Sequence, residues 1–175
     1  MFLPRSVIYR YLGLPQKSVL REDVEIRIKE AQLWLSQYSF LQSLILPVKI
    51  SITNCDEVLL DENIIKSGTV YKLVAEHSVQ KAFLIFVFLP EIIDEQTEYL
   101  WQKNRVDEAY FLDSIATSFI TFYVQNLPKS LQKKVESDEI LLPGVSPGHF
   151  DWALSEQKNI FSLFQKKYPF IPAFV

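Results

Sequence analysis

The sequence predicts an α+β fold with an antiparallel sheet, and three observations support this prediction. Helical patterns are grouped and strand patterns are grouped, without the regular alternation that builds a parallel sheet. Residues 46–53 alternate apolar and polar side chains, as a strand with one buried face does. Residues 81–89 are apolar on both alternations, which predicts a central strand covered on both faces. We expect one domain, residues 1–175.

Composition narrows the classes of protein further. Hydrophobic residues make up 49% of the chain and aromatic residues 14%, enough for a packed core. The formal net charge is −3 and no run of Lys or Arg exceeds two, so no nucleic-acid partner is expected. The longest apolar run, Ala82–Leu89, is shorter than the roughly 20 residues that span a bilayer. The segment MFLPRSVIYRYLGL lacks the long apolar core of a secretory signal, so we expect a cytoplasmic protein without membrane contact.

The N-terminal part of the chain contains one clear helical pattern. Residues 5–12 are expected to form a short helix or strand that leads to Gly13. Residues 22–43 carry apolar side chains three and four positions apart, which predicts an amphipathic helix. The apolar face of that helix consists of Val24, Ile28, Ala31, Leu35 and Tyr38.

A hairpin and a capped helix are expected in the middle of the chain. Residues 57–68 suit a short hairpin, and Ser67 or Thr69 suits the N-cap of a helix that runs to about Glu76. After the strand 81–89, residues 91–102 predict a helix with acidic residues in its first turn.

The C-terminal half predicts two more helices. Residues 105–127 form a long helix that Pro128 is expected to end. Its apolar stripe consists of Ala109, Leu112, Ala116, Phe119, Ile120 and Tyr123. Residues 130–136 suit a short polar helix or turn, and residues 140–147 an extended segment. Ser155 suits the start of a last helix, and prolines keep the tail 168–175 extended.

Motifs of well-known enzyme classes are absent from the sequence. It has no GxxxxGK[ST], GxGxxG, HExxH or GxSxG, and only four glycines for loops that hold phosphate. Two histidines and one cysteine argue against a zinc site, so we expect no metal-binding residue. The single Cys55 excludes an internal disulfide and is expected to be a small buried residue rather than a nucleophile.

The two histidines differ in their surroundings. His77 lies at the end of a predicted helix, where it interacts favourably with the helix dipole. His149 lies in SPGHFDW, where Pro147 and Gly148 fix the backbone and Asp151 could orient the imidazole. Backbone groups on such a loop can recognise a ligand. The alternative is a structural turn with an exposed histidine.

Small hydroxyl side chains form a strip on the helix 105–127. Its members are Ser114, Thr117, Ser118 and Thr121. Small groups would let a backbone or a flat ligand come close. The alternative, which the residues alone favour, is that the hydroxyls bond to carbonyls one turn earlier in the helix.

Three stretches carry a resemblance to a known family. They are VIYRYLGL, VDEAYFLDSIATSFITFYV and above all SPGHFDWALSEQKNIFSLF. The chain resembles the activation domain of cobalamin-dependent methionine synthase, in particular the short stand-alone relatives found with corrinoid proteins. The family signature is approximately R-x-S-P-G-Y-G-D-W-P-L-x-x-Q. The resemblance covers residues 7–167.

The resemblance implies a fold and a function. The fold would be an α+β domain with a bent antiparallel sheet. The domain would bind S-adenosylmethionine and dock on a partner that holds cobalamin, with flavodoxin or another reductant as electron donor. It would then support reductive methylation of inactive cobalamin, as an accessory to a methyltransferase of methionine biosynthesis. Methyl transfer to cobalt requires alignment rather than a general base, so no catalytic residue is expected.

The resemblance also implies a binding site and shows where this chain departs from the family. The expected S-adenosylmethionine-binding residues are Gly144, Val145, Ser146, Pro147, Gly148, His149, Asp151, Trp152, Thr117 and Thr121. Gly144 stands where the family has arginine, His149 where it has tyrosine, and Phe150 where it has a second glycine. Ala153 replaces a proline, and a family glutamate falls near Thr121. These departures keep an alternative open, a non-catalytic module that binds or caps a corrinoid protein without using S-adenosylmethionine.

Overall fold

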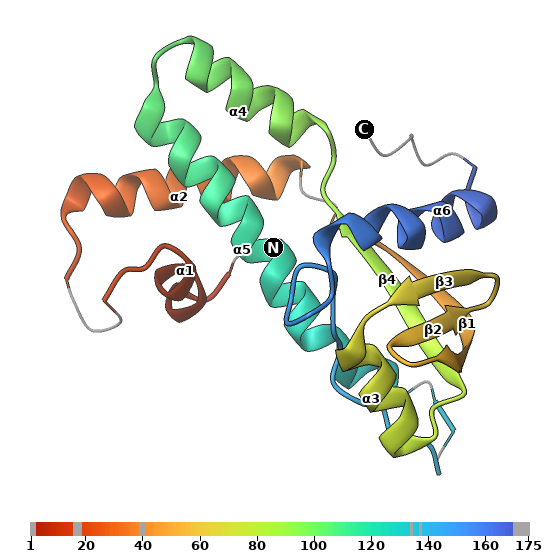
Figure 1. The fold of residues 1–175 in the computed structure, drawn as a ribbon. Coiled ribbons are helices and arrows are strands. Elements are labelled where there is room, and N and C mark those ends of the chain that lie inside the picture. The colour runs from red at the N-terminus through yellow and green to blue at the C-terminus, as the bar shows by residue number, and fades with distance from the viewer. Residues whose placement is uncertain (1–2, 16–18, 39–40, 134, 137, 170–175) are drawn as a thin grey trace. The chain divides into compact units, whose positions relative to one another are not determined.

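The computed structural model describes residues 3–15, 19–38, 41–133, 135–136 and 138–169. These residues form a mixed α+β structure with one four-stranded sheet and helices α1 to α6 (Figure 1). The chain divides into two compact units. We call Met1–Ser43 with Val87–Leu141 the helical unit, and Leu44–Phe86 with Leu142–Val175 the sheet unit. None of the described helices combines the length and hydrophobicity needed to cross a bilayer.

The helical unit contains α1 (Arg5–Tyr11), α2 (Glu22–Tyr38), α4 (Ile92–Gln102) and α5 (Val106–Gln132). The other three helices all pack on α5, and α4 and α5 form a helical hairpin (Figure 1). The core of the unit includes Ile8, Leu35, Ala109 and Ile115, which are almost completely buried. Of the two alternatives left open for residues 5–12, helix or strand, the structure has the helix α1, and the helix predicted over 91–102 is confirmed as α4.

Two predicted helix ends are wrong. The helix predicted over 22–43 ends at Tyr38, because Gln42 and Ser43 already belong to β1 (Gln42–Asn54). Pro128 does not end α5, which continues to Gln132. Proline lacks the N–H that would bond to the preceding turn. Leu127 and Leu131 are buried, however, and that burial is gained only if the helix continues.

The sheet has the strand order β3-β2-β1-β4. In addition to β1 it contains β2 (Glu57–Leu60), β3 (Asn63–Lys66) and β4 (Lys81–Phe88). The pairs β1–β2 and β2–β3 are antiparallel, and Figure 1 shows β4 running opposite to β1. The antiparallel sheet and the hairpin predicted over 57–68 are therefore confirmed. Val48 and Ile50 of β1 are buried as predicted, whereas Ile52 is exposed.

The predicted position of β4 in the sheet is wrong. The strand lies at the edge rather than in the centre, beside β1. Phe86 packs against Phe161 and Phe164 of α6 (Gln157–Lys167), with ring centroids 5.2 and 5.8 Å apart. On the opposite face Ile85 is 38% exposed. An apolar run on both alternations shows that both faces have some cover, but it cannot tell a central strand from an edge strand.

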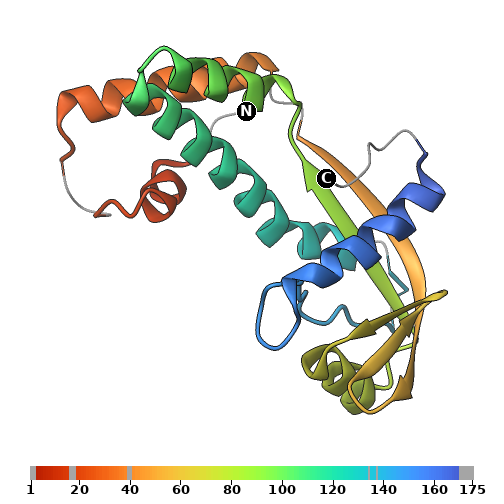
Figure 2. The same ribbon diagram turned by 45° about the horizontal axis from the view of Figure 1, so that its top comes forward.

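The described part of the sheet unit contains two α-helices, α3 and α6. Of the two predicted caps of α3 (Gly68–His77), the structure has Ser67, whose hydroxyl accepts a hydrogen bond from the Val70 amide at 3.2 Å. α6 runs across the sheet (Figure 2), and Asn63 donates a hydrogen bond to the Asn159 carbonyl at 3.0 Å. Ser155 lies in a short 3-10 turn before α6 and does not cap it. Most of the tail predicted as extended, residues 170–175, lies outside the described residues.

Candidate functional site

The segment from Ser146 to Trp152 forms a tight loop that is closed by its own backbone. The Gly148 amide donates to the Trp152 carbonyl at 2.7 Å, and the Trp152 amide donates to the His149 carbonyl at 3.1 Å. The His149 amide donates to the Ser146 carbonyl at 3.2 Å. These three N–H groups therefore serve the loop itself, and a ligand would have to use other polar groups.

Two residues of this loop have a left-handed backbone. Gly148 has φ +88°, and an added Cβ would lie 3.1 Å from Cδ1 of Leu154. Phe150 has φ +55°, a conformation that is uncommon for a bulky side chain. Phe150 is also 86% exposed, so burial does not offset the strain.

Asp151 fastens the loop to the N-terminus of α3. Its two carboxylate oxygens each lie 3.1 Å from the Thr69 amide, and the Ser67 hydroxyl donates to Oδ1 at 3.2 Å. Hydrogen bonds from the Thr69 side chain and backbone, and then from Ser67, lower the pKa of Asp151. A Cβ on Gly68 would come within 2.6 Å of Asp151 Oδ2, so glycine leaves room for this contact.

The expectation that Asp151 orients His149 is wrong. Nδ1 of His149 pairs with the Ser146 hydroxyl at 2.7 Å, and the carboxylate of Asp151 points to α3. A carboxylate satisfies the free N–H groups at a helix N-terminus better than it satisfies an exposed ring. The imidazole is exposed and keeps Nε2 for another partner.

Trp152 anchors the other end of the loop. Its side chain is 6% exposed and belongs to the core between the sheet, α3 and α6. The indole Nε1 is buried and has no hydrogen-bond partner among the described residues. An unpaired buried donor is unusual enough to require an explanation.

Thr117 and Thr121 lie on α5, in the helical unit. The Thr121 hydroxyl donates to the Thr117 carbonyl at 2.9 Å, and the Ser118 hydroxyl donates to the Ser114 carbonyl at 2.7 Å. Ser118 is fully buried. The strip therefore shows the backbone bonding expected of a structural role. The ten expected binding residues form two groups, eight in the sheet unit and two in the helical unit.

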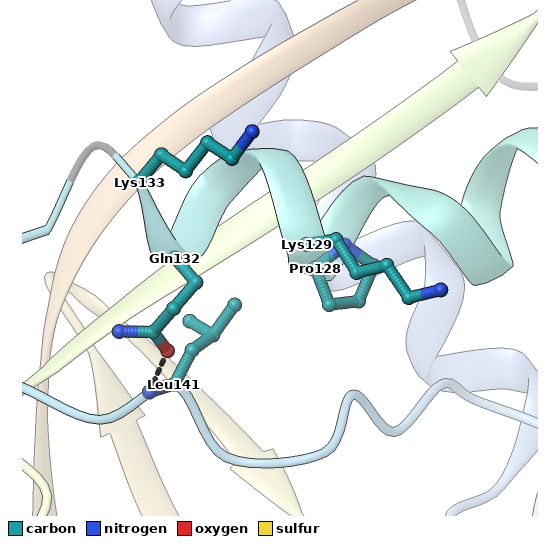
Figure 3. A pocket seen from close by; sticks show the side chains of 5 residues that line it. All are labelled: Pro128, Lys129, Gln132, Lys133 and Leu141. Carbon is teal, nitrogen blue, oxygen red and sulfur yellow. Dashed lines mark hydrogen bonds between the residues drawn. The ribbon is translucent and has the colours of Figure 1, made fainter.

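A hollow of about 460 Å³ lies at the end of α5 (Figure 3). Its walls are Pro128, Lys129, Gln132, Lys133 and Leu141, none of which was expected from the sequence. Gln132 holds the following segment in place, because its Oε1 accepts from the Leu141 amide at 2.8 Å and its Nε2 donates to the Glu139 carbonyl at 3.0 Å. The sequence signal for this hollow is the pair Lys129 and Lys133, four positions apart and next to Pro128.

The remaining candidate residues, which include Cys55 and His77, form no recognisable site among the described residues. Among the described residues, no group of three or more His, Cys, Asp and Glu side chains gathers to hold a metal ion. Cys55 is exposed, contrary to the expectation of burial, because it lies in the turn between β1 and β2 beside Asp56. A second hollow, of about 270 Å³, lies between α1 and α2 and involves no expected site residue. His77 is the last residue of α3, as predicted, and its side chain is exposed.

No protein-family model matches the chain, and a search of the curated proteins finds no match.

Proposed function

We propose that this chain is a stand-alone reactivation partner of a cobalamin-dependent methionine synthase, with a fold like that of the family's activation domain. The loop 144–152 would bind S-adenosylmethionine. The observation that carries the proposal is the backbone of Gly148 and Phe150, with φ of +88° and +55°. These are the two positions at which the signature SPGYGDW has glycine. Glycine adopts positive φ at no steric cost, so positive φ at both positions, Phe150 included, supports the match of this loop to the signature.

The anchoring of the loop supports the same proposal. Asp151 and Trp152, two further signature residues, hold the loop to α3 and to the core. A binding loop must keep its shape before the ligand arrives, because ordering it on binding would lower affinity. The signature residues then act by positioning, and direct contacts fall to their neighbours.

The contacts available to S-adenosylmethionine differ from those of the family. With three loop amides bonded internally, the exposed polar groups include the His149 imidazole, which takes the place of the family tyrosine. Gly144 supplies no charge for the methionine carboxylate, where the family has arginine. Since arginine pairs with a carboxylate through two hydrogen bonds, its loss predicts weaker binding than in the family.

The chemistry would belong to the ligand and to the partner. S-adenosylmethionine would supply a methyl group to reduced cobalt held by the partner and would leave as S-adenosylhomocysteine, after a reductant such as flavodoxin has supplied the electron. This chain would hold the sulfonium methyl group in line with the cobalt and exclude water, which needs no general base.

Isothermal titration calorimetry tests the proposal directly. S-adenosylmethionine should bind the purified chain, and His149→Ala should weaken binding by about tenfold, the usual scale for one hydrogen bond with its contact area. Thr69→Ser, which keeps the backbone amide bonded to Asp151, serves as the matched control. Absence of binding at millimolar ligand, with and without a cobalamin partner, would exclude the proposal.

A second function is favoured by a specific observation. Three of the loop amides are bonded within the loop, and neither of the two hollows is lined by a loop residue. A non-catalytic module that binds or caps a corrinoid protein would need no ligand pocket at all. Capture of a purified corrinoid protein together with a failed S-adenosylmethionine titration would support this function. Methylation of cobalt in a reconstituted assay would refute it.

A further inference from the structure

The hollow between α1 and α2 belongs to the helical unit and is lined by no residue of the loop 144–152. Its volume is about 270 Å³, larger than the ~150 Å³ cavity that is enough for benzene. Leu3, Ile8 and Ile28 line it and are all buried. The rest of the lining is polar. Apolar surface with a few polar groups is typical of sites for small molecules.

Arg5 of α1 is held in position beside this hollow. Its Nε donates to the Tyr9 hydroxyl at 2.5 Å, and its Nη2 donates to Glu25 of α2 at 2.6 Å. The guanidinium also lies over the Tyr9 ring, 4.8 Å from the ring centroid. Nη1 has no acceptor among the described residues. A guanidinium that is already positioned loses little freedom when its remaining N–H groups bind an acceptor.

Two further groups of the lining have hydrogens without an acceptor. Tyr9 is only 2% exposed, and its hydroxyl oxygen accepts from Arg5, but no described residue accepts its proton. Gln32 accepts from the Leu3 amide through Oε1 at 3.0 Å, which leaves its NH₂ group unbonded within the described part of the chain. A donor that lacks an acceptor is costly to bury, so a ligand that accepts hydrogen bonds would relieve this cost.

Lys29 adds a positive charge to the same hollow. It forms no ion pair with another described residue. The two carboxylates within one helical turn of it are bonded elsewhere, Glu25 to Arg5 at 2.6 Å and Glu30 to Arg27 at 2.9 Å. The helix α1 contains no acidic residue. Two cations and one carboxylate give the lining a net charge of +1, which suits a ligand with a single negative charge.

We propose that this hollow binds a small aliphatic carboxylic acid in its ionised form. The carboxylate accepts hydrogen bonds from the side chains of Arg5, Tyr9, Lys29 and Gln32, and the aliphatic chain packs on the apolar lining. Phosphate fits less well, because it has no apolar part and its second negative charge has no counterpart in the lining. The ligand bridges α1 and α2 and therefore stabilises the folded helical unit. This site is independent of the S-adenosylmethionine binding proposed for the loop.

Calorimetric titration of the full chain with hexanoate tests the proposal. The Kd should be about 1 mM or lower, which is within reach of a ligand of this size. Hexanamide, which has the same shape without the charge, should bind about tenfold more weakly, and so should inorganic phosphate. N-acetylleucine, which imitates the C-terminal residue of a peptide, should also bind more weakly, because its amide N–H enters a hollow that already has an excess of donors.

Substitutions in the lining give the matched comparison. Lys29→Gln and Tyr9→Phe should each weaken hexanoate binding by about tenfold, the scale of one hydrogen bond to a charged group. Gln32→Glu keeps the acceptor for the backbone amide that it bonds but adds a like charge, so it should weaken binding further. Lys72→Gln and Tyr110→Phe, at exposed positions outside the hollow, should bind as the wild type does. Thermal melting verifies folding, and the exposed Lys29 keeps the test valid if Tyr9→Phe unfolds.

Nuclear magnetic resonance locates the bound acid. Nuclear Overhauser effects should join the hexanoate methylene groups to the methyl groups of Ile8 and Ile28. Hexanoate that does not bind at millimolar concentration would overturn the proposal, as would hexanamide or phosphate that binds equally well. Tighter binding of N-acetylleucine would overturn the assignment to a free acid. Equal losses in Lys72→Gln and Lys29→Gln would show that the acid responds to overall charge and not to this hollow.

Discussion

The loop around His149 and the hydroxyl strip on α5 differ in where their hydrogen bonds go. The strip bonds within its own helix, from Ser118 to Ser114 and from Thr121 to Thr117. The loop bonds through Asp151 to Thr69, 82 residues away in sequence. The strip is explained by the helix alone, whereas the loop carries strain at Phe150 and an unpaired donor at Trp152. Functional tests therefore belong first on the loop.

The largest expected effect is at the buried anchor of the loop. Trp152→Ala should lower the free energy of unfolding by about 3–5 kcal/mol, because a large buried ring leaves a cavity. Ser118→Ala, equally buried but bonded only within its helix, should cost less than about 1 kcal/mol, since alanine is the better helix former. Urea denaturation of both variants measures the difference. Equal losses would mean that the strip is as important to the fold as the loop anchor.

A conservative change at the same residue separates packing from polarity. Trp152→Phe keeps most of the ring and removes the unpaired Nε1–H, whose burial costs about 1–3 kcal/mol. It should therefore lose much less stability than Trp152→Ala in the same denaturation experiment. If Trp152→Phe is as unstable as Trp152→Ala, then Nε1 has a partner, such as a buried water, in solution.

The next effect is the pH dependence of the loop fastening. Bonds from Thr69 and Ser67 lower the pKa of Asp151 below the ordinary 3.8, so the folded chain favours the carboxylate. That stabilisation is present above pH 3.8 and is lost as the pH falls through the lowered pKa. Asp151→Asn should therefore melt at a lower temperature than wild type at pH 7, and the difference should shrink below pH 3.8. Asp113→Asn, on the exposed side of α5, is the control, and a difference independent of pH would contradict the assignment.

The smallest expected change in the free energy of unfolding is at Phe150, whose backbone is left-handed. Phe150→Gly should raise the free energy of unfolding by up to about 1 kcal/mol, because glycine has no Cβ to oppose a left-handed backbone. Phe150→Ala keeps the Cβ and should stay within about 0.5 kcal/mol of wild type. Thermal melting of the two variants distinguishes them. A Phe150→Gly variant less stable than Phe150→Ala would show that Phe150 is not strained in solution.

Features encoded by local patterns were predictable from the sequence. The spacing of Ile28, Ala31 and Leu35 placed the buried face of α2, and Ser67 was one of the two residues predicted to cap α3. The mixed α+β class and the hairpin of β2 and β3 followed from the grouping and alternation of side chains. Each of these features depends on residues close together in the sequence, so a local pattern is enough to predict it.

Features that depend on distant partners were not predictable. The edge position of β4 depends on which strands pair with β1, which is a choice between elements far apart in the sequence. The course of α5 through Pro128 depends on what buries Leu127 and Leu131. The Asp151 carboxylate accepts from the Thr69 amide at the start of α3 and not from its neighbour His149. The room for this contact beside Gly68 exists only in the folded chain, so the sequence did not reveal it.

The hydrogen bond between Asp151 and the Thr69 amide also makes this amide a probe of loop opening. The Thr69 N–H points at the carboxylate that holds the loop down, so it is protected from solvent while the loop is closed. Its rate of hydrogen exchange with heavy water therefore measures the free energy of opening the loop, whatever the loop binds. A molecule that stabilises the closed loop must lower the exchange rate of the Thr69 amide, and a molecule that opens the loop must raise it.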